Sequence, residues 1–162
     1  MTAVITGVSA KHPAAMRCAA MLKKQGTAVY AAEQAAGAAM KAAVAAALRE
    51  RGQIDLLICG AGTGMLSPHP LPAAQDALPL YENGLWGASD ACAAVLPHMR
   101  KAGQGKILLF CTASRKTDPA AQALLAYGNA LCAVLQPYGV TAQVLRYQSN
   151  AVQAWAAVYQ AR

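Results

Sequence analysis

The residues best suited to bind a ligand are glycines that directly follow two short apolar runs. Gly7 comes after Ala3–Thr6, and the segment Gly60-Ala61-Gly62 comes after Ile54–Cys59. A glycine lets the backbone come close to a ligand because it carries no Cβ, and free N–H groups in such a loop can bind a phosphate. This spacing therefore favours a phosphate-bearing ligand such as a nucleotide.

Other reactive side chains are scattered and form no catalytic or metal-binding pattern. The three histidines lie far apart, and none has another ligand at metal-binding spacing, so we expect no metal site. No serine lies in a nucleophile-elbow sequence. The cysteines stand singly in apolar stretches, which predicts reduced, buried thiols in a cytoplasmic protein; they are Cys18, Cys59, Cys92, Cys111 and Cys132.

Strand-like and helical segments alternate along the chain and would position the two glycine segments. Short apolar runs followed by turn residues predict five strands, at 3–6, 28–32, 54–59, 106–111 and 140–145. Longer alanine-rich stretches predict helices at 13–24, 36–50, 84–102 and 118–136, with a short helix at 151–160. Each strand is thus joined to the next by one helical crossover.

This alternation predicts an α/β fold. Right-handed crossovers place the strands in a three-layer, doubly wound, Rossmann-like parallel sheet of about five strands, with the order 2-1-3-4-5. We expect residues 1–162 to form a single domain of this kind. Ligands of such sheets bind at the carboxyl ends of the strands, beside the point where the strand order reverses. Gly7 and Gly60 follow the two strands that flank this point.

Composition narrows the class of protein further. The chain of 162 residues is 56% hydrophobic and carries a formal net charge of +7. Its cations occur singly or in pairs, mostly near predicted helix ends, so we expect no nucleic-acid partner. No apolar run is long enough to span a membrane, and the N-terminus has no basic segment typical of a secretion signal. These features predict a cytoplasmic protein with no membrane partner.

Five segments, in this order, resemble the short-chain dehydrogenase/reductase family, and among its members the 3-oxoacyl-carrier-protein reductases. Val4–Gly7 resembles the start of the family's TGxxxGxG turn, and Ile54–Gly62 resembles the strand that ends in NNAG. Gly84–Gly87 and Ala94–Met99 resemble the NLxG and LPxM motifs. Gly105–Thr112 resembles the GKIVNISS strand, and Pro137–Val144 resembles the PYGIxVNxV strand. The resemblance implies a Rossmann fold and an NAD(P)-dependent oxidoreductase ancestry.

The phosphate-binding turn departs from the family pattern. The family uses three glycines, whereas here Gly7 is followed by Lys11 and Pro13 at the other two positions. A side chain at Lys11 prevents the close backbone approach, although its ammonium group could meet a phosphate as a point charge. The alternative is that Lys11 is a solvated loop residue.

Glu33 follows the second predicted strand and has two possible equivalents in the family. It can match the acidic residue that receives the adenosine ribose hydroxyls, or the Asp of the next strand near the adenine. The ambiguity arises because the family has one more strand and helix before its NNAG strand. A third interpretation is a carboxylate stabilised by a helix N-terminus. The chain also stops soon after Leu145–Asn150, so we expect a truncated member without the family's substrate lid.

The family's Asn-Ser-Tyr-Lys tetrad is replaced at every position. Alignment on the glycine after the catalytic helix puts Thr117 at the Tyr position and Ala121 at the Lys position. Thr112 takes the Ser position, and Gly84 takes the Asn position, or Asn83 if the register slips by one. Proton transfer by a tyrosine near neutral pH needs the lysine, because an unassisted phenol titrates near about 10. We therefore predict no catalytic residue.

Tyr127 does not restore the missing catalytic pair. It is the tyrosine of the predicted helix 118–136, but Leu131 stands four residues later, where the family has lysine. Alignment by distance from Thr112 instead puts Leu125 and Asn129 at the Tyr and Lys positions. We expect Tyr127 to be a half-buried packing residue.

The predicted helices 84–102 and 118–136 correspond to those that form a four-helix dimer interface in the family. Their apolar residues are too numerous for one sheet-facing stripe, so we expect a homodimer, or a heterodimer with a full-length reductase, through these helices. The apolar residues are Leu85, Trp86, Ala91, Cys92, Val95 and Leu96 on the first, and Ala120, Leu124, Leu125, Leu131, Cys132 and Leu135 on the second.

Two functions remain open from the sequence. The first is a non-catalytic family member that serves as a structural or regulatory subunit and needs no cofactor. The second is a minimal oxidoreductase with a rearranged site that binds NAD or NADP. The candidate nucleotide-binding residues are Gly7, Lys11, Glu33, Gly60, Ala61 and Gly62.

Overall fold

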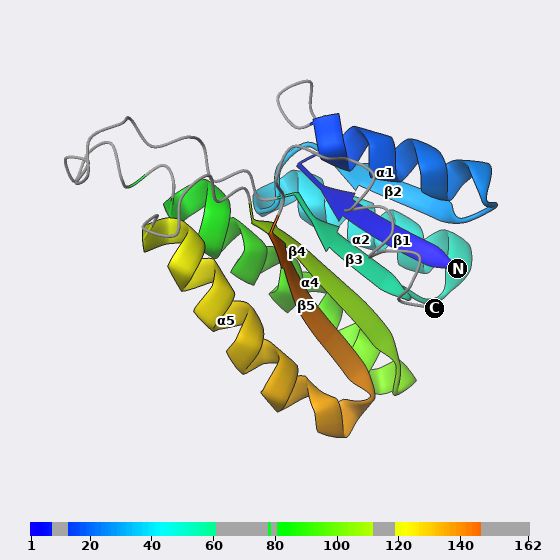
Figure 1. Cartoon of the computed structure of the whole chain (residues 1–162). Helices are drawn as coiled ribbons and strands as arrows, with labels where there is room; N and C mark the ends of the chain where they lie inside the picture. Colours follow the sequence, from blue (N-terminus) through cyan, green and yellow to red (C-terminus); the bar gives the residue numbers. More distant parts are fainter. Residues whose placement is uncertain (8–12, 61–77, 79–80, 112–118, 147–162) are drawn as a thin grey trace.

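The computed structural model describes residues 1–7, 13–60, 78, 81–111 and 119–146. One sheet contains five strands: β1 (Thr2–Thr6), β2 (Ala28–Ala32), β3 (Leu56–Cys59), β4 (Gly105–Cys111) and β5 (Val140–Arg146). Their order is β2-β1-β3-β4-β5, and all neighbouring pairs are parallel. The predicted Rossmann-like fold and strand order are confirmed (Figure 1).

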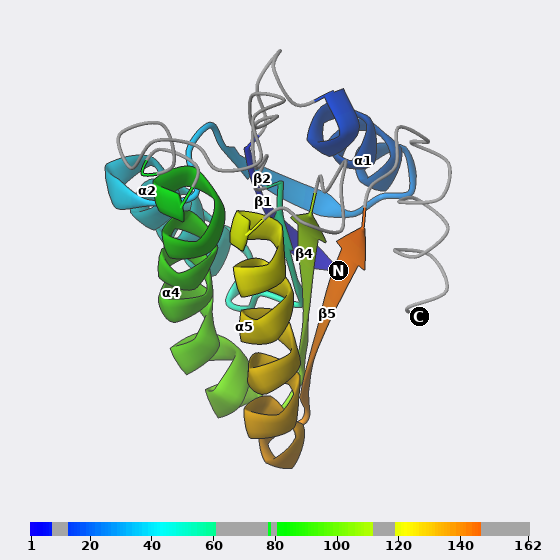
Figure 2. The same ribbon diagram turned by 60° about the vertical axis from the view of Figure 1, so that its left-hand side comes forward.

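Helices cover both faces of this sheet. They are α1 (Pro13–Lys24), α2 (Gly37–Arg51), α4 (Gly87–Ala102) and α5 (Pro119–Leu135). A π-helical turn, η1 (Glu82–Trp86), runs directly into α4, and a 3-10 turn, η2 (Gln136–Tyr138), follows α5. Figures 1 and 2 show α1 on one face, with α2, α4 and α5 on the other.

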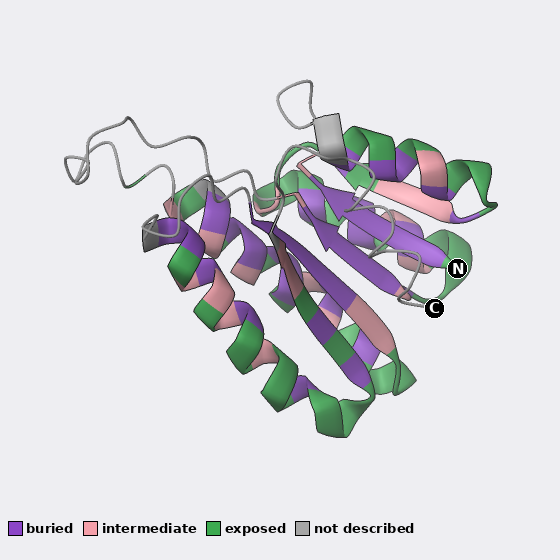
Figure 3. Ribbon diagram, in the orientation of Figure 1, coloured by how far each residue is buried: buried purple, intermediate pink, exposed green. Residues whose placement is uncertain are grey.

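The core is divided into two layers by the alternation of strand side chains. Ile5, Ile58 and Leu108 pack toward α1, whereas their neighbours Leu57 and Leu109 pack toward α2, α4 and α5. All residues of β1 and β3 are buried, as expected for central strands covered on both faces (Figure 3). These two strands therefore hold their carboxyl ends rigidly beside each other.

The strand after α2 begins later than the sequence predicted. Ile54 and Asp55 precede β3, although Asp55 already contacts a neighbouring strand end: the Thr2 N–H donates to Asp55 Oδ2 at 2.7 Å. The Asp55 N–H in turn donates to the Thr2 carbonyl at 2.9 Å. The predicted helix at 151–160 lies outside the described residues.

The outer surfaces of the two long helices correct one prediction. Most apolar residues of α4 and α5 face the sheet, so a second continuous apolar face does not exist on α4. Its exposed residues are mostly polar or small; they include Trp86 just before it and Asp90, Ala93, Pro97, His98, Arg100 and Lys101. By contrast, α5 contains no charged residue, and its exposed residues are Gln122, Ala126, Asn129, Ala130, Cys132, Ala133 and Val134.

Candidate functional site

The carboxyl ends of β1 and β3 touch through two glycines. The Gly60 N–H donates to the Thr6 carbonyl at 3.1 Å, and a Cβ on Gly60 would lie 2.8 Å from that same oxygen. A Cβ on Gly7 would collide with the Gly60 carbonyl oxygen, and Gly7 has a φ of 71°. Both positions therefore require glycine to join the two strands, whether or not a ligand binds there.

Glu33 lies beside this pair. Thr6 pairs with Ala32 in the sheet, so the next residues, Gly7 and Glu33, are neighbours at the carboxyl edge. Glu33 is exposed, and no ion pair to it forms within the described residues. The structure thus brings together Gly7, Gly60 and Glu33 of the predicted nucleotide-binding residues. The other three, Lys11, Ala61 and Gly62, lie outside the described part of the chain.

Two of the residues that the sequence alignment puts at catalytic-tetrad positions, Gly84 and Ala121, lie in the described part of the chain. Neither has a side chain that could act as an acid or a base. Gly84 is buried in η1, and Ala121 is fully buried in the first turns of α5. The Ala121 carbonyl accepts a hydrogen bond from the Cys111 thiol at 3.9 Å. Thr112 and Thr117 lie outside the described residues.

Tyr127 is half-buried between α5 and α4, as predicted. Burial, followed by the charge of Cys92, raises the pKa of Tyr127 to about 12, although a hydrogen bond with Ser89 opposes the shift. A general acid or base for neutral pH needs a pKa near 7, and this shift is in the opposite direction. Tyr127 therefore packs the interface between the two helices.

Two cysteines that the sequence analysis treated separately come together beside Tyr127. Cys59 ends β3, Cys92 lies in the second turn of α4, and both are fully buried. Their hydrogen bond, with burial, holds the pKa of Cys59 well above its usual value. Hydrogen bonds with Cys59 and then Tyr127 lower the pKa of Cys92. Cys59 and Cys92 are far apart in the sequence, so sequence analysis did not identify the pair. They meet because α4 crosses β3.

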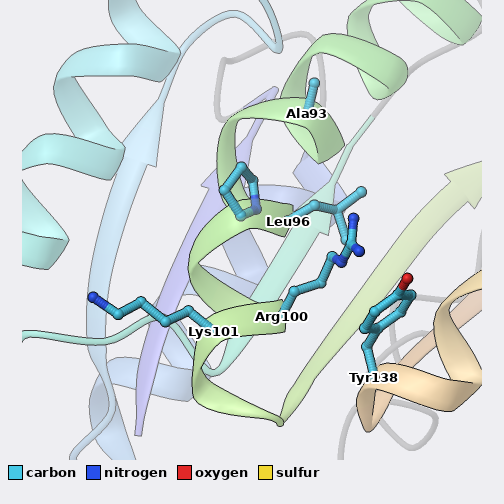
Figure 4. Close-up of a pocket in the computed structure, with 6 residues that line it drawn as sticks. Ala93, Leu96, Arg100, Lys101 and Tyr138 are labelled. Atoms are coloured by element: carbon cyan, nitrogen blue, oxygen red, sulfur yellow. The ribbon is translucent and has the colours of Figure 1, made fainter.

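A groove lies at the opposite end of the sheet, between α4 and η2. Its volume is about 490 Å³, and its lining combines apolar side chains with two cations: Ala93, Leu96, Pro97, Arg100, Lys101 and Tyr138. The Arg100 guanidinium lies 3.8 Å from the centre of the Tyr138 ring. Figure 4 shows Leu96 and Arg100 on the side of α4 toward Tyr138, whereas Lys101 points away.

Neither a metal centre nor a membrane span is found in the described ranges. No three His, Cys, Asp or Glu side chains gather there in a way that could hold a metal ion. No described helix combines the length and apolar character that crossing a membrane requires.

Comparisons with known proteins agree with this architecture. A family model described as short chain dehydrogenase matches residues 2–154. The 3-ketodihydrosphingosine reductase of Bacteroides thetaiotaomicron is 35% identical over 69 residues, which are 43% of this chain and 26% of that protein. The match thus spans about a quarter of that relative's length.

Solved structures share the fold at low sequence identity. A Serratia marcescens short-chain dehydrogenase/reductase has a TM-score of 0.81 and 18% identity, covering 98% of this chain and 87% of that one. A gluconate 5-dehydrogenase from Burkholderia cenocepacia, solved with NADP and tartrate, has a TM-score of 0.64 and 23% identity, covering 90% and 69%. Because the family model covers nearly the whole chain, this protein belongs to the short-chain dehydrogenase family.

Proposed function

We propose that this chain is a non-catalytic member of its family that acts as a partner subunit. It pairs through α4 and α5 with a second copy of itself or with a full-length reductase. The observation that supports the proposal is the full burial of Ala121, the residue that alignment on Gly139 puts at the position of the family's catalytic lysine. Without that lysine, no group lowers the pKa of a tyrosine toward neutrality.

The state of Tyr127 supports the same conclusion. Its pKa is raised to about 12, so its phenol stays protonated over the whole physiological range. Leu131, one turn later, adds an apolar neighbour rather than a cation. This tyrosine therefore supports packing and does not serve as a proton donor.

The outer surface of α5 supports the association. Alanines at 126, 130 and 133 and Val134 are exposed, and Val134 is 65% exposed. A helix of 17 residues without a single charge is unusual on a surface that faces only water. Small side chains also let a partner helix come close, so burial of this surface against another subunit would be favourable.

A minimal NAD(P)-dependent oxidoreductase remains the second candidate, and the carboxyl edge of the sheet favours it. There the Gly7–Gly60 contact keeps the strand ends in the family's arrangement, and Glu33 could accept hydrogen bonds from ribose hydroxyls. A bound nucleotide would supply or receive the hydride. The described residues fit the binding of such a group but include no side chain at this edge that would move the proton.

Nucleotide titration combined with light scattering separates the two candidates. We expect NADH and NADPH to bind no tighter than about 100 μM in calorimetry and thermal-shift assays, and the chain to be dimeric at micromolar concentration. Tighter binding that Glu33→Gln weakens, together with hydride transfer to a carbonyl compound, would establish the oxidoreductase. A monomer that also captures no full-length reductase would contradict the subunit role.

A further inference from the structure

Trp86 begins an exposed stripe along α4. Trp86, Asp90, Ala93, Pro97 and Arg100 are all exposed and recur at intervals of three or four residues, so they lie on one side of the helix. Trp86 as a whole residue is 51% exposed, although such a large apolar side chain is usually mostly buried. From Trp86 to Arg100 the stripe is about 21 Å long, at 1.5 Å per residue.

The other end of this stripe is the groove between α4 and η2. Its apolar wall is formed by Ala93, Leu96 and Pro97, and its far side by Tyr138. The Arg100 guanidinium lies over the Tyr138 ring, and a planar guanidinium is a group that stacks well on aromatic side chains such as an indole. Ligand pockets begin at about 300 Å³, so a groove of about 490 Å³ accepts an indole.

A contact between two glycines holds the two walls of this groove in place. The Gly103 and Gly139 caps of α4 and η2 meet so closely that a Cβ on Gly139 would collide with the Gly103 carbonyl oxygen. This contact fixes Tyr138 opposite Arg100. Pro97 lies inside α4 and cannot donate the usual intrahelical hydrogen bond to the Ala93 carbonyl.

We propose that the occupant of this groove is Trp86 of a second copy of the chain. The inference rests on the proposed association through α4 and α5, and it specifies homodimerisation with two equivalent contacts. In an antiparallel pair of α4 helices, Trp86 of each copy stacks on Arg100 of the other. Ala93, midway along the stripe, then lies at the two-fold axis, where its small side chain permits close approach.

Charge along the stripe agrees with the antiparallel orientation. Asp90 lies toward the Trp86 end, and Arg100 lies at the other; neither forms an ion pair within the described residues. Antiparallel helices bring each acidic end toward the partner's basic end, whereas parallel helices would bring like charges together. The stripe is thus complementary to itself, as a two-fold symmetric interface requires.

Fluorescence of a single tryptophan tests the contact directly. The chain has two tryptophans, so Trp155→Phe leaves Trp86 as the reporter. We expect its emission to be blue-shifted at high protein concentration and to move red on dilution, in step with the dimer fraction from light scattering. A dimer that dissociates without any change in Trp86 emission would overturn the proposed contact and leave the subunit role intact.

Cross-linking tests where the axis lies. In a Cys132→Ser background, which removes the exposed native thiol, Ala93→Cys should form an intermolecular disulfide on mild oxidation. Ala42→Cys, on the exposed surface of α2, is the matched control and should remain uncross-linked. Equal cross-linking of both variants, or none at Ala93→Cys in a proven dimer, would exclude an axis at Ala93.

Substitutions measure how much the contact contributes. Trp86→Ala should raise the dimer dissociation constant at least about tenfold, and Arg100→Gln should do so by a smaller factor. Met16→Ala removes another exposed apolar side chain, 47% exposed on α1, and should leave the dissociation constant unchanged. An unchanged dimer dissociation constant for Trp86→Ala would overturn the inference. A wild-type chain that stays monomeric would also overturn it. In that case the subunit role survives only if the chain binds a full-length reductase.

Discussion

The two ends of the sheet are built alike and carry different chemistry. At the carboxyl end Gly7 touches Gly60, and at the amino end Gly139 touches Gly103; in both pairs a side chain would collide with a carbonyl oxygen. Beside the first pair the described residues place one carboxylate, Glu33. Beside the second they place a cation stacked on an aromatic ring and an open groove.

This difference shows that the backbone of a site can be retained for structural reasons while its side chains change. The glycines at the carboxyl end stay necessary for strand packing even without a ligand, so their presence says little about nucleotide binding. The surface of α4 and η2 has no such structural requirement for an exposed indole or a cationic groove. Its side chains are therefore the better guide to what the protein does.

Substitution of the glycines that both ends of the sheet share should have the largest effect on stability. Gly7→Ala and Gly139→Ala each combine a positive φ with a backbone collision, so we expect a loss of about 2–4 kcal/mol in the free energy of unfolding. Gly26→Ala is the control, because Gly26 has a φ of 77° but open space around it; it should cost about 1 kcal/mol. Urea denaturation measures all three, and equal losses would show that the two contacts add nothing.

A charge introduced on the outer surface of α5 should weaken the association between subunits. Ala130→Glu places a carboxylate on the exposed, uncharged side of α5, where association would bury it. We expect the dimer dissociation constant to rise at least about tenfold, because an unpaired buried charge is costly. Light scattering over a dilution series measures it. Ala42→Glu on the exposed surface of α2 should leave the constant unchanged, and a similar rise there would point to general charge repulsion.

The fold could be predicted from the sequence because its signals are local. Buried apolar runs such as Leu56–Cys59 stand between helices that end at glycines, and the handedness of the crossovers then determines the strand order. Glu33 could be placed beside Gly7 for the same reason, since residues that follow neighbouring parallel strands share one edge. Most predicted boundaries lie within one residue of the observed ones, and the largest shift at a strand is the two-residue later start of β3.

The groove and the thiol pair could not be predicted in this way. Arg100 meets Tyr138 because the ends of α4 and η2 touch, and Cys59 meets Cys92 because α4 crosses β3. Both contacts join residues far apart in sequence and depend on helix rotation, which periodicity leaves uncertain by a residue or two. Counting apolar residues likewise overestimated the outer face of α4, because alanines and Cys92 were needed on the sheet side.

Titration of Tyr127 tests whether the contact between α5 and the first turns of α4 has catalytic potential, and its expected effect is smaller. The pKa of Tyr127 is about 12 in the folded chain and about 10 when unfolded. Its contribution to stability is therefore fully present below pH 10 and is lost as the pH rises through 12. Tyr127→Phe should remove one late transition from the near-ultraviolet absorbance titration. A transition of this tyrosine near neutral pH would instead support the oxidoreductase.

Thiol reactivity gives the smallest expected signal and leaves the fold unchanged. Cys132 is exposed, whereas the other four cysteines are buried. We expect one thiol to react quickly with a chromogenic disulfide reagent in the native state and all five after unfolding in urea. Cys132→Ser should abolish the fast phase. A second fast thiol that disappears in Cys92→Ala would show that the Cys59–Cys92 pair is reached from the carboxyl end.

The π-helical turn Glu82–Trp86 affects how this chain is aligned with its relatives. A π turn holds one residue more than an α turn and behaves as a local insertion within a helix. Counting forward from before the turn and counting back from α4 therefore give different equivalents for the same family position. Gly84 and Asn83, the two residues given above for the family's Asn position, both lie within this turn.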